Sequence, residues 1–95
     1  MKTLTICGSM RFAEAMREIA YRLEAEDGYS VLQCVYGDGK QPDERERKRL
    51  AAAHCRKIDL SDGIYVVNIG GYIGDAVRQE IEYAKRYGKE ILYHE

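Results

Sequence analysis

One carboxylate occupies a position where a helix packed on a sheet normally carries an apolar side chain. Residues 75–87 are predicted to form a helix because their apolar side chains recur at helical spacing. Glu80 lies three residues after Val77 and four before Ala84, inside that apolar stripe. A carboxylate directed at a core must be paired or must line a cavity. Glu80 therefore either lines a site or reaches outward to solvent or to an arginine.

His54 is a second polar residue on a predicted apolar face. Asp43 is expected to cap a helix over residues 43–60, whose apolar stripe is Leu50, Ala51, His54 and Ile58. Histidine exchanges protons near neutral pH, because its unperturbed pKa is about 6.5. His54 is thus either a half-buried histidine with its hydrogen bonds satisfied, or a group that donates a proton or orients Glu80.

A loop after the first predicted strand has the composition of an anion-binding turn. Gly8, Ser9 and Arg11 offer backbone N–H groups, a hydroxyl and a guanidinium, which suit a phosphate or a carboxylate. The segment is neither a Walker A loop nor a dinucleotide-binding G-x-G-x-x-G motif. A plain strand-to-helix turn is the alternative.

A second loop, residues 68–75, concentrates three of the nine glycines, Gly70, Gly71 and Gly74. Glycine allows the backbone to approach a ligand closely, and an aromatic ring such as that of Tyr72 can stack on a planar group. Candidate ligand contacts in this loop are Asn68, Gly71, Tyr72 and Asp75. The alternative is a flexible turn before a helix.

These residues are placed by alternating strands and helices. Strands are predicted over residues 3–7, 30–36, 64–69 and 90–93, and helices over 13–27, 43–60 and 75–87. The alternation predicts a single α/β domain, residues 1–95, with a three-layer flavodoxin-like parallel sheet of four strands in the order 2-1-3-4 and helices on both faces. Ligands bind such sheets at the carboxyl ends of the strands, beside the switch point between strands 1 and 3, where both loops should meet.

Composition limits the classes of function. The 95 residues carry 15 basic and 16 acidic side chains, so the chain has no overall field for a nucleic-acid polymer. No apolar run approaches the ~20 residues that span a membrane. The first residues lack the apolar core of a signal peptide, so we expect a cytoplasmic protein with its three cysteines reduced. No cofactor is expected, nor a metal site, because His54 and His94 lie far apart in the sequence.

Three segments together resemble the nucleoside 2-deoxyribosyltransferase family. They are Cys-Gly-Ser-Met-Arg at 7–11, SDGIYVVN at 61–68, and GGYIGDAVRQEIEYAKRYGK at 70–89. The first is especially similar to relatives that hydrolyse 2′-deoxynucleoside 5′-monophosphates. The most specific part is Gly74, then Glu80 followed four residues later by Ala84, with Gly88 and Lys89 before the last strand.

The resemblance implies a mechanism and roles for residues. Glu80 stands at the position of the family's nucleophile, which attacks C1′ of a 2-deoxyribosyl group through an oxocarbenium-like transition state. Gly8, Ser9 and Arg11 would hold the sugar or its 5′-phosphate, and Tyr72 would pack on the base or sugar. His54 stands where the family usually has an acidic residue. Gly74 stands where the family usually has an acidic or hydroxyl residue, and Asp75 lies one place after it.

The expected function is therefore cleavage or transfer of the N-glycosidic bond of a 2′-deoxynucleoside or its 5′-monophosphate. The alternative is a non-catalytic module of the same fold that senses a nucleotide. A third interpretation is an assembly protein that uses its sheet edge and tyrosines as an interface. The expected partner is a small-molecule nucleoside or nucleotide, and the uncovered edge of the strand at 90–93 suggests a homodimer or a higher homo-oligomer.

Overall fold

A computed structural model describes the whole chain, residues Met1–Glu95. Four parallel strands form one sheet in the order β2-β1-β3-β4, which confirms the predicted fold class. The elements in chain order are β1 (Thr3–Gly8), the 3-10 turn η1 (Met10–Phe12), α1 (Ala13–Ala25), β2 (Ser30–Leu32), α2 (Glu44–Asp59), β3 (Gly63–Val67), the 3-10 turn η2 (Ile69–Gly71), α3 (Asp75–Arg86) and β4 (Glu90–Tyr93). None of the helices has the length and apolar character needed to cross a membrane.

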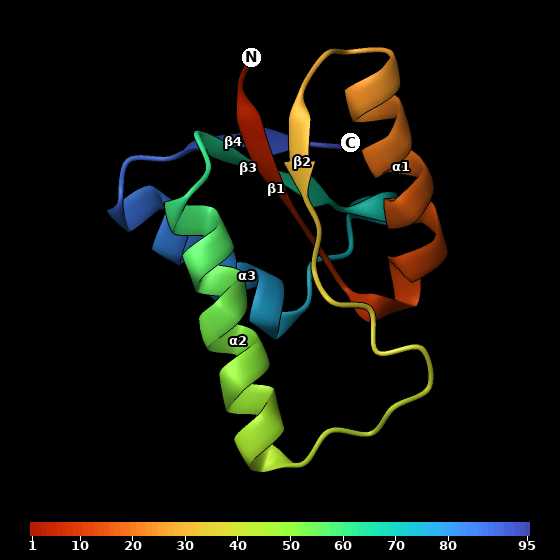
Figure 1. Cartoon of the computed structure of the whole chain (residues 1–95), viewed down its shortest axis with the longest axis vertical. Helices are drawn as coiled ribbons and strands as arrows, with labels where there is room; N and C mark the ends of the chain where they lie inside the picture. The colour runs from red at the N-terminus through yellow and green to blue at the C-terminus, as the bar shows by residue number, and fades with distance from the viewer.

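The helices cover both faces of the sheet, with α1 on one face and α2 and α3 on the other (Figure 1). Successive residues of a strand point to opposite faces, so β1 serves two separate cores. Ile6 packs on the α1 side with residues such as Met16. Cys7 packs on the other side with residues such as Ile58 and Val77. This alternation directs the Cys7 side chain toward α2 and α3.

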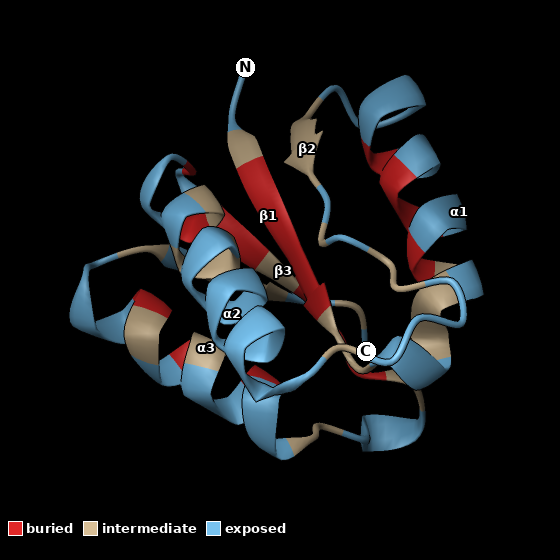
Figure 2. Ribbon diagram, turned by 60° about the horizontal axis from the view of Figure 1, so that its bottom comes forward, coloured by how far each residue is buried: buried red, intermediate tan, exposed pale blue.

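Helix α2 is anchored to the sheet only near its carboxyl end. Asp43 and Glu46 form a reciprocal capping box that fixes where the helix begins. Ile58 is the only buried residue of the helix, whereas Leu50 is 42% exposed. The predicted stripe is therefore core only at Ile58. The amino-terminal half of α2 is exposed (Figure 2) and extends past the carboxyl ends of the strands (Figure 1).

Strand β2 is shorter than predicted, ending at Leu32 rather than at residue 36. It is an edge strand that pairs only with β1, from Thr3 opposite Ser30 to Thr5 opposite Leu32. Beyond that point β1 pairs only with β3, and the chain after Leu32 leaves the sheet. The residues that leave include Cys34 and Val35, which line a cleft.

The end of β1 comes very close to α1. A Cβ atom added at Gly8 would lie 2.8 Å from Met16 Sδ and 3.2 Å from Val67 Cβ. Contacts under 3.0 Å force a neighbour to move, so only glycine fits here without displacing the Met16 side chain. Gly8 thus lets the strand end against the first helix, where the first predicted loop begins.

Candidate functional site

A cleft of about 420 Å³ opens at the carboxyl end of β1, between the stripe of α2 and the first turns of α3. Parallel sheets bind ligands at this end of their strands. The cleft is lined by Gly8, Met10, Cys34, Val35, Arg47, Leu50, Ala51, Ala53, His54, Lys57, Ala76 and Glu80. Three predicted site residues, Gly8, His54 and Glu80, are therefore brought together here.

Glu80 enters the cleft because its own helix holds it there. Val77 and Ala84, one turn before and one turn after it, are 4% and 0% exposed against the sheet. Residues three and four apart share a helix face, so Glu80 is directed to the same side. Its side chain remains 23% exposed, because the cleft gives it access to solvent.

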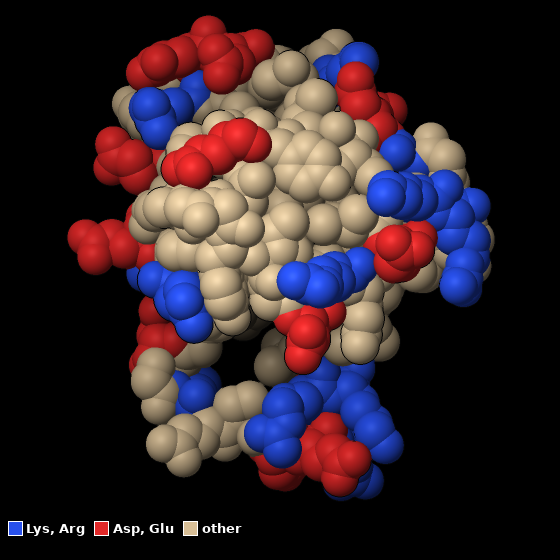
Figure 3. Space-filling model, turned by 180° about the vertical axis from the view of Figure 1, so that it is seen from behind, with Lys and Arg blue, Asp and Glu red and all other residues tan.

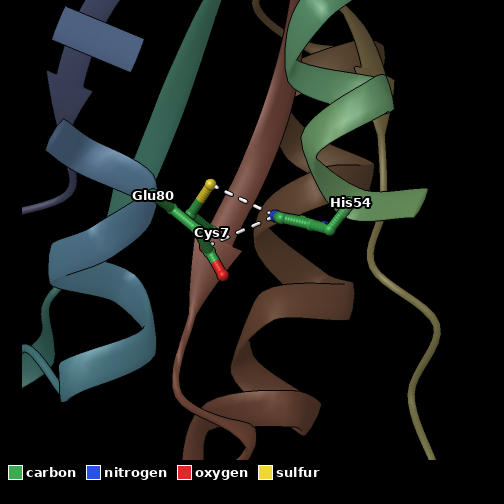
Figure 4. A group of neighbouring side chains, drawn as sticks. All are labelled: Cys7, His54 and Glu80. Atoms are coloured by element: carbon green, nitrogen blue, oxygen red, sulfur yellow. Dashed lines mark hydrogen bonds and ion pairs between the residues drawn. The ribbon is translucent and has the colours of Figure 1, made fainter. Parts of the chain in front are cut away.

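His54 approaches Glu80 from the opposite wall of the cleft. Ile58, four residues further along α2, is 0% exposed and fixes this part of the helix against the core. His54 Nε2 lies 3.4 Å from Glu80 Oε1, and the His54 side chain is 12% exposed (Figure 4). The imidazole can therefore orient the carboxylate or transfer a proton beside it.

Cys7 completes a cluster of three side chains with His54 and Glu80 (Figure 4). Its Sγ lies 3.4 Å from His54 Nε2 and 3.8 Å from the carbonyl oxygen of Thr5. Burial raises the pKa of the Cys7 thiol well above its ordinary range, and the nearby Glu80 charge raises it further. The thiol therefore stays protonated and can donate to the Thr5 carbonyl. His54 Nε2–H is then free to donate to Glu80.

The cleft also carries two cations that no carboxylate neutralises. Arg47 Nη1 donates to the Pro42 carbonyl oxygen at 2.7 Å, and Lys57 Nζ donates to the Gln33 carbonyl oxygen at 2.7 Å. Neither cation forms an ion pair within 4.0 Å of an acidic side chain. These two charges outnumber the single carboxylate, Glu80, in the lining of the cleft. Its electrostatics therefore favour an anionic ligand.

A second hollow of about 530 Å³ adjoins the cleft and shares Val35 and Leu50 with it. Its charged lining residues are Lys40, Arg49 and Glu46, and neither cation pairs with a carboxylate. Figure 3 shows the molecule hollowed between its main body and a projecting part that carries both basic and acidic side chains. The excess of positive charge thus continues beyond the cleft.

The two predicted loops do meet, and their contact lies beside the cleft, although Gly8 and Met10 of the first loop line it. Ser9 Oγ accepts a hydrogen bond of 3.3 Å from the Arg11 backbone N–H. The Arg11 guanidinium carbon lies 3.8 Å from the centre of the Tyr72 ring, a cation–π contact. The Tyr72 ring also packs against the Phe12 ring in an edge-to-face arrangement, with the ring centres 6.1 Å apart. Ser9, Arg11 and Tyr72 form one group, none of them lining the cleft.

Three other predicted contacts are placed elsewhere. The Asn68 amide bonds the backbone of Glu95 twice, at 3.2 Å and 2.8 Å, and so ties down the residues after β4. Gly71 is exposed and has a φ of 80°, which serves the turn before Tyr72. Asp75 is exposed at the start of α3, next to the cleft residue Ala76.

No family model, curated protein or solved structure matches this chain.

Among the residues that were not predicted as site residues are Arg47 and Lys57, which line the cleft, and Cys7, which lies buried behind it. One signal for them is the composition of the α2 stripe, where alanines, His54 and cations replace the large apolar residues of a core helix. The signal for Cys7 is its place directly before Gly8, at the carboxyl end of a buried strand. A thiol at that position faces α2 and α3 and so lies beside the switch point.

Proposed function

We propose that this protein cleaves or transfers the N-glycosidic bond of a 2′-deoxynucleoside 5′-monophosphate or its nucleoside, with Glu80 as the nucleophile. The observation that carries the proposal is the Glu80 carboxylate, partly exposed in a cleft at the carboxyl end of the sheet and 3.4 Å from His54. A carboxylate that is fixed by its helix yet open to a ligand has the access that covalent glycoside chemistry needs.

The proposed reaction has two steps. A Glu80 oxygen forms a bond to C1′ while the C1′–N bond breaks, and the electron pair of that bond leaves with the base, which takes up a proton. His54 either supplies that proton or holds the carboxylate in the attacking orientation. Water then hydrolyses the glycosyl ester, or a second base displaces Glu80.

The excess of positive charge supports the monophosphate as the substrate. Arg47 and Lys57 are held near the cleft by backbone carbonyls, so little side-chain entropy is lost when a phosphate binds them. A nucleoside without a phosphate leaves both cations unpaired. The similarity of residues 7–11 to the monophosphate hydrolases supports the same substrate, although Ser9 and Arg11 themselves lie beside the cleft and not in its lining.

A second candidate is a module that binds the nucleotide without cleaving it. The observation that favours it is His54, which occupies a position where the resembled family usually carries an acidic residue. The two candidates share a ligand and differ only in turnover, so one assay separates them.

The test is incubation of the protein with each 2′-deoxynucleoside 5′-monophosphate and each 2′-deoxynucleoside, followed by chromatography for free base. Glu80→Gln keeps the size of the side chain and removes its charge. Glu82→Gln, an exposed position on the same helix, is the matched control. Release by wild type and Glu82→Gln but not by Glu80→Gln supports the enzyme. Saturable binding without release supports the sensor. If the protein shows no binding and no release, both candidates are overturned.

We further propose a homo-oligomer in the cytoplasm. β4 is an edge strand with one free side, which can pair with a second copy. All three cysteines are free, as thiols are in a reducing compartment. Analytical sedimentation tests the assembly, and a single monomeric species at high concentration would overturn it.

A further inference from the structure

The cluster of Cys7, His54 and Glu80 brings together three kinds of donor that bind metal ions. One sulfur, one imidazole nitrogen and one carboxylate oxygen all lie within 4.8 Å of one another. They come from β1, α2 and α3, so no spacing in the sequence indicates the set. No metal site was expected from the sequence, because the two histidines, His54 and His94, lie far apart in it. In the structure His94 Nδ1 lies 3.0 Å from the Tyr65 hydroxyl oxygen, away from the cluster.

The distances are close to those of a tetrahedral zinc site. Ligands bind zinc at about 2.3 Å for sulfur and about 2.0–2.2 Å for nitrogen or oxygen, which puts neighbouring donors roughly 3.3–3.8 Å apart. His54 Nε2 lies 3.4 Å from both Cys7 Sγ and Glu80 Oε1. The sulfur and the carboxylate oxygen lie within 4.8 Å of each other, and Glu80 has a long, partly exposed side chain that can adjust to an ion.

The donor types and their surroundings favour zinc over other common divalent ions. Thiolate and imidazole bind zinc well, whereas magnesium and calcium require sets of oxygen ligands. Glu80 and His54 line the cleft and Cys7 lies behind them, so a bound ion has three protein ligands and one position facing the cleft. Three ligands and an open fourth position describe a site that water or a small ligand can share.

We propose that Cys7, His54 and Glu80 bind a zinc ion, and that the bound zinc inhibits the reaction by occupying the Glu80 carboxylate. Binding forms a Zn–S bond and a Zn–N bond, releases the thiol proton of Cys7 to solvent and moves the His54 proton from Nε2 to Nδ1, with no change of oxidation state. The inhibition rests on the proposed function, because it needs Glu80 as nucleophile. The binding itself does not depend on any activity of the protein.

The test of binding uses cobalt(II) as a spectroscopic substitute for zinc, added to the reduced protein without substrate. We expect one tetrahedral cobalt per chain with a thiolate charge-transfer band, and displacement of the cobalt by zinc. Cys7→Ser should abolish the band, and His54→Ala should weaken binding by more than about tenfold, the usual cost of losing even an outer-shell partner. Cys55→Ser, on the same helix as His54, is the matched control and should keep the band.

Absence of the thiolate charge-transfer band in the wild type, or its survival in Cys7→Ser, would overturn the proposed zinc site. Circular dichroism of Cys7→Ser and His54→Ala identifies any variant that has lost its fold. Zinc titrated into the base-release assay then tests the inhibition. Cobalt binding in a protein without base release would contradict the proposed function and leave the metal site standing, whereas base release insensitive to saturating zinc would overturn the inhibition alone.

Discussion

His54 Nε2 and Glu80 Oε1 lie 3.4 Å apart on two different helices, each fixed by a buried neighbour. Ile58 fixes α2, and Val77 and Ala84 fix α3. The contact therefore depends on the packing of both helices on the same face of the sheet. Changes at His54 should alter the chemistry at Glu80 more than they alter the fold.

We expect His54→Ala to lower kcat for base release by about 10²-fold or more, the usual contribution of a positioned proton donor. His54→Gln keeps a side-chain N–H near Glu80 and should recover part of that loss if the imidazole mainly orients the carboxylate. Steady-state kinetics measures both. His94→Ala is the control, because His94 contacts Tyr65 away from the cleft. Unchanged kcat in His54→Ala would contradict a role in the reaction.

Neutralising Arg47 or Lys57 should weaken binding of the monophosphate selectively. Each substitution, Arg47→Gln or Lys57→Gln, removes one charge-assisted hydrogen bond and should raise KM for the monophosphate about tenfold or more. KM for the nucleoside should stay constant, as should kcat. Lys48→Gln is the matched control, because the Lys48 side chain is 78% exposed and pairs with Glu44. An equal rise in KM for the monophosphate and the nucleoside would show that these cations do not bind the phosphate group.

Stability should depend on the two halves of α2 unequally. Ile58→Ala removes a fully buried side chain and should lower the free energy of unfolding by about 2–5 kcal/mol. Leu50→Ala, at a position 42% exposed beside the cleft, should cost less than about 1 kcal/mol. Urea unfolding measures both differences. Equal losses would mean that the amino-terminal half of α2 also packs on a core.

The sequence predicted some parts of the site better than others. The order of strands and helices follows from periodicity and turn residues, and Glu80 is evident because it interrupts a strongly apolar stripe. The α2 stripe is ambiguous, because alanines and His54 fit a core face and a cleft wall equally well. The cluster with Cys7 could not be predicted, because it depends on how three separate elements pack.

Alkaline pH should destabilise the fold through Cys7. In the unfolded chain its thiol loses a proton near its ordinary pKa of 9.0, whereas burial raises the pKa in the folded chain. The unfolded state then binds fewer protons than the folded state, so the free energy of unfolding falls as pH rises above about 9. Urea unfolding at a series of pH values from neutral to above about 9, under reducing conditions, measures how steeply the free energy of unfolding falls with pH.

The thiol can be separated from other groups by substitution. Cys7→Ala should be less stable than wild type at neutral pH but should lose stability less steeply as pH rises. Ile58→Val, a destabilised variant with the thiol intact, is the control and should keep the wild-type slope. A Cys7→Ala slope equal to that of wild type would assign the effect to other groups, such as Tyr83, whose pKa is raised to about 12 by its hydrogen bond to Asp59.

The proposed reaction passes through a covalent bond between Glu80 and C1′ of the sugar. The most direct measurement is mass spectrometry of the acid-quenched protein after reaction with a 2′-fluorinated substrate analogue, since the electron-withdrawing fluorine slows breakdown of the glycosyl ester. Nucleophilic attack by Glu80 predicts an added glycosyl mass on the peptide that contains Glu80, and no adduct in Glu80→Gln. Base release by the wild type with no adduct on that peptide, together with undiminished release by Glu80→Gln, would contradict it.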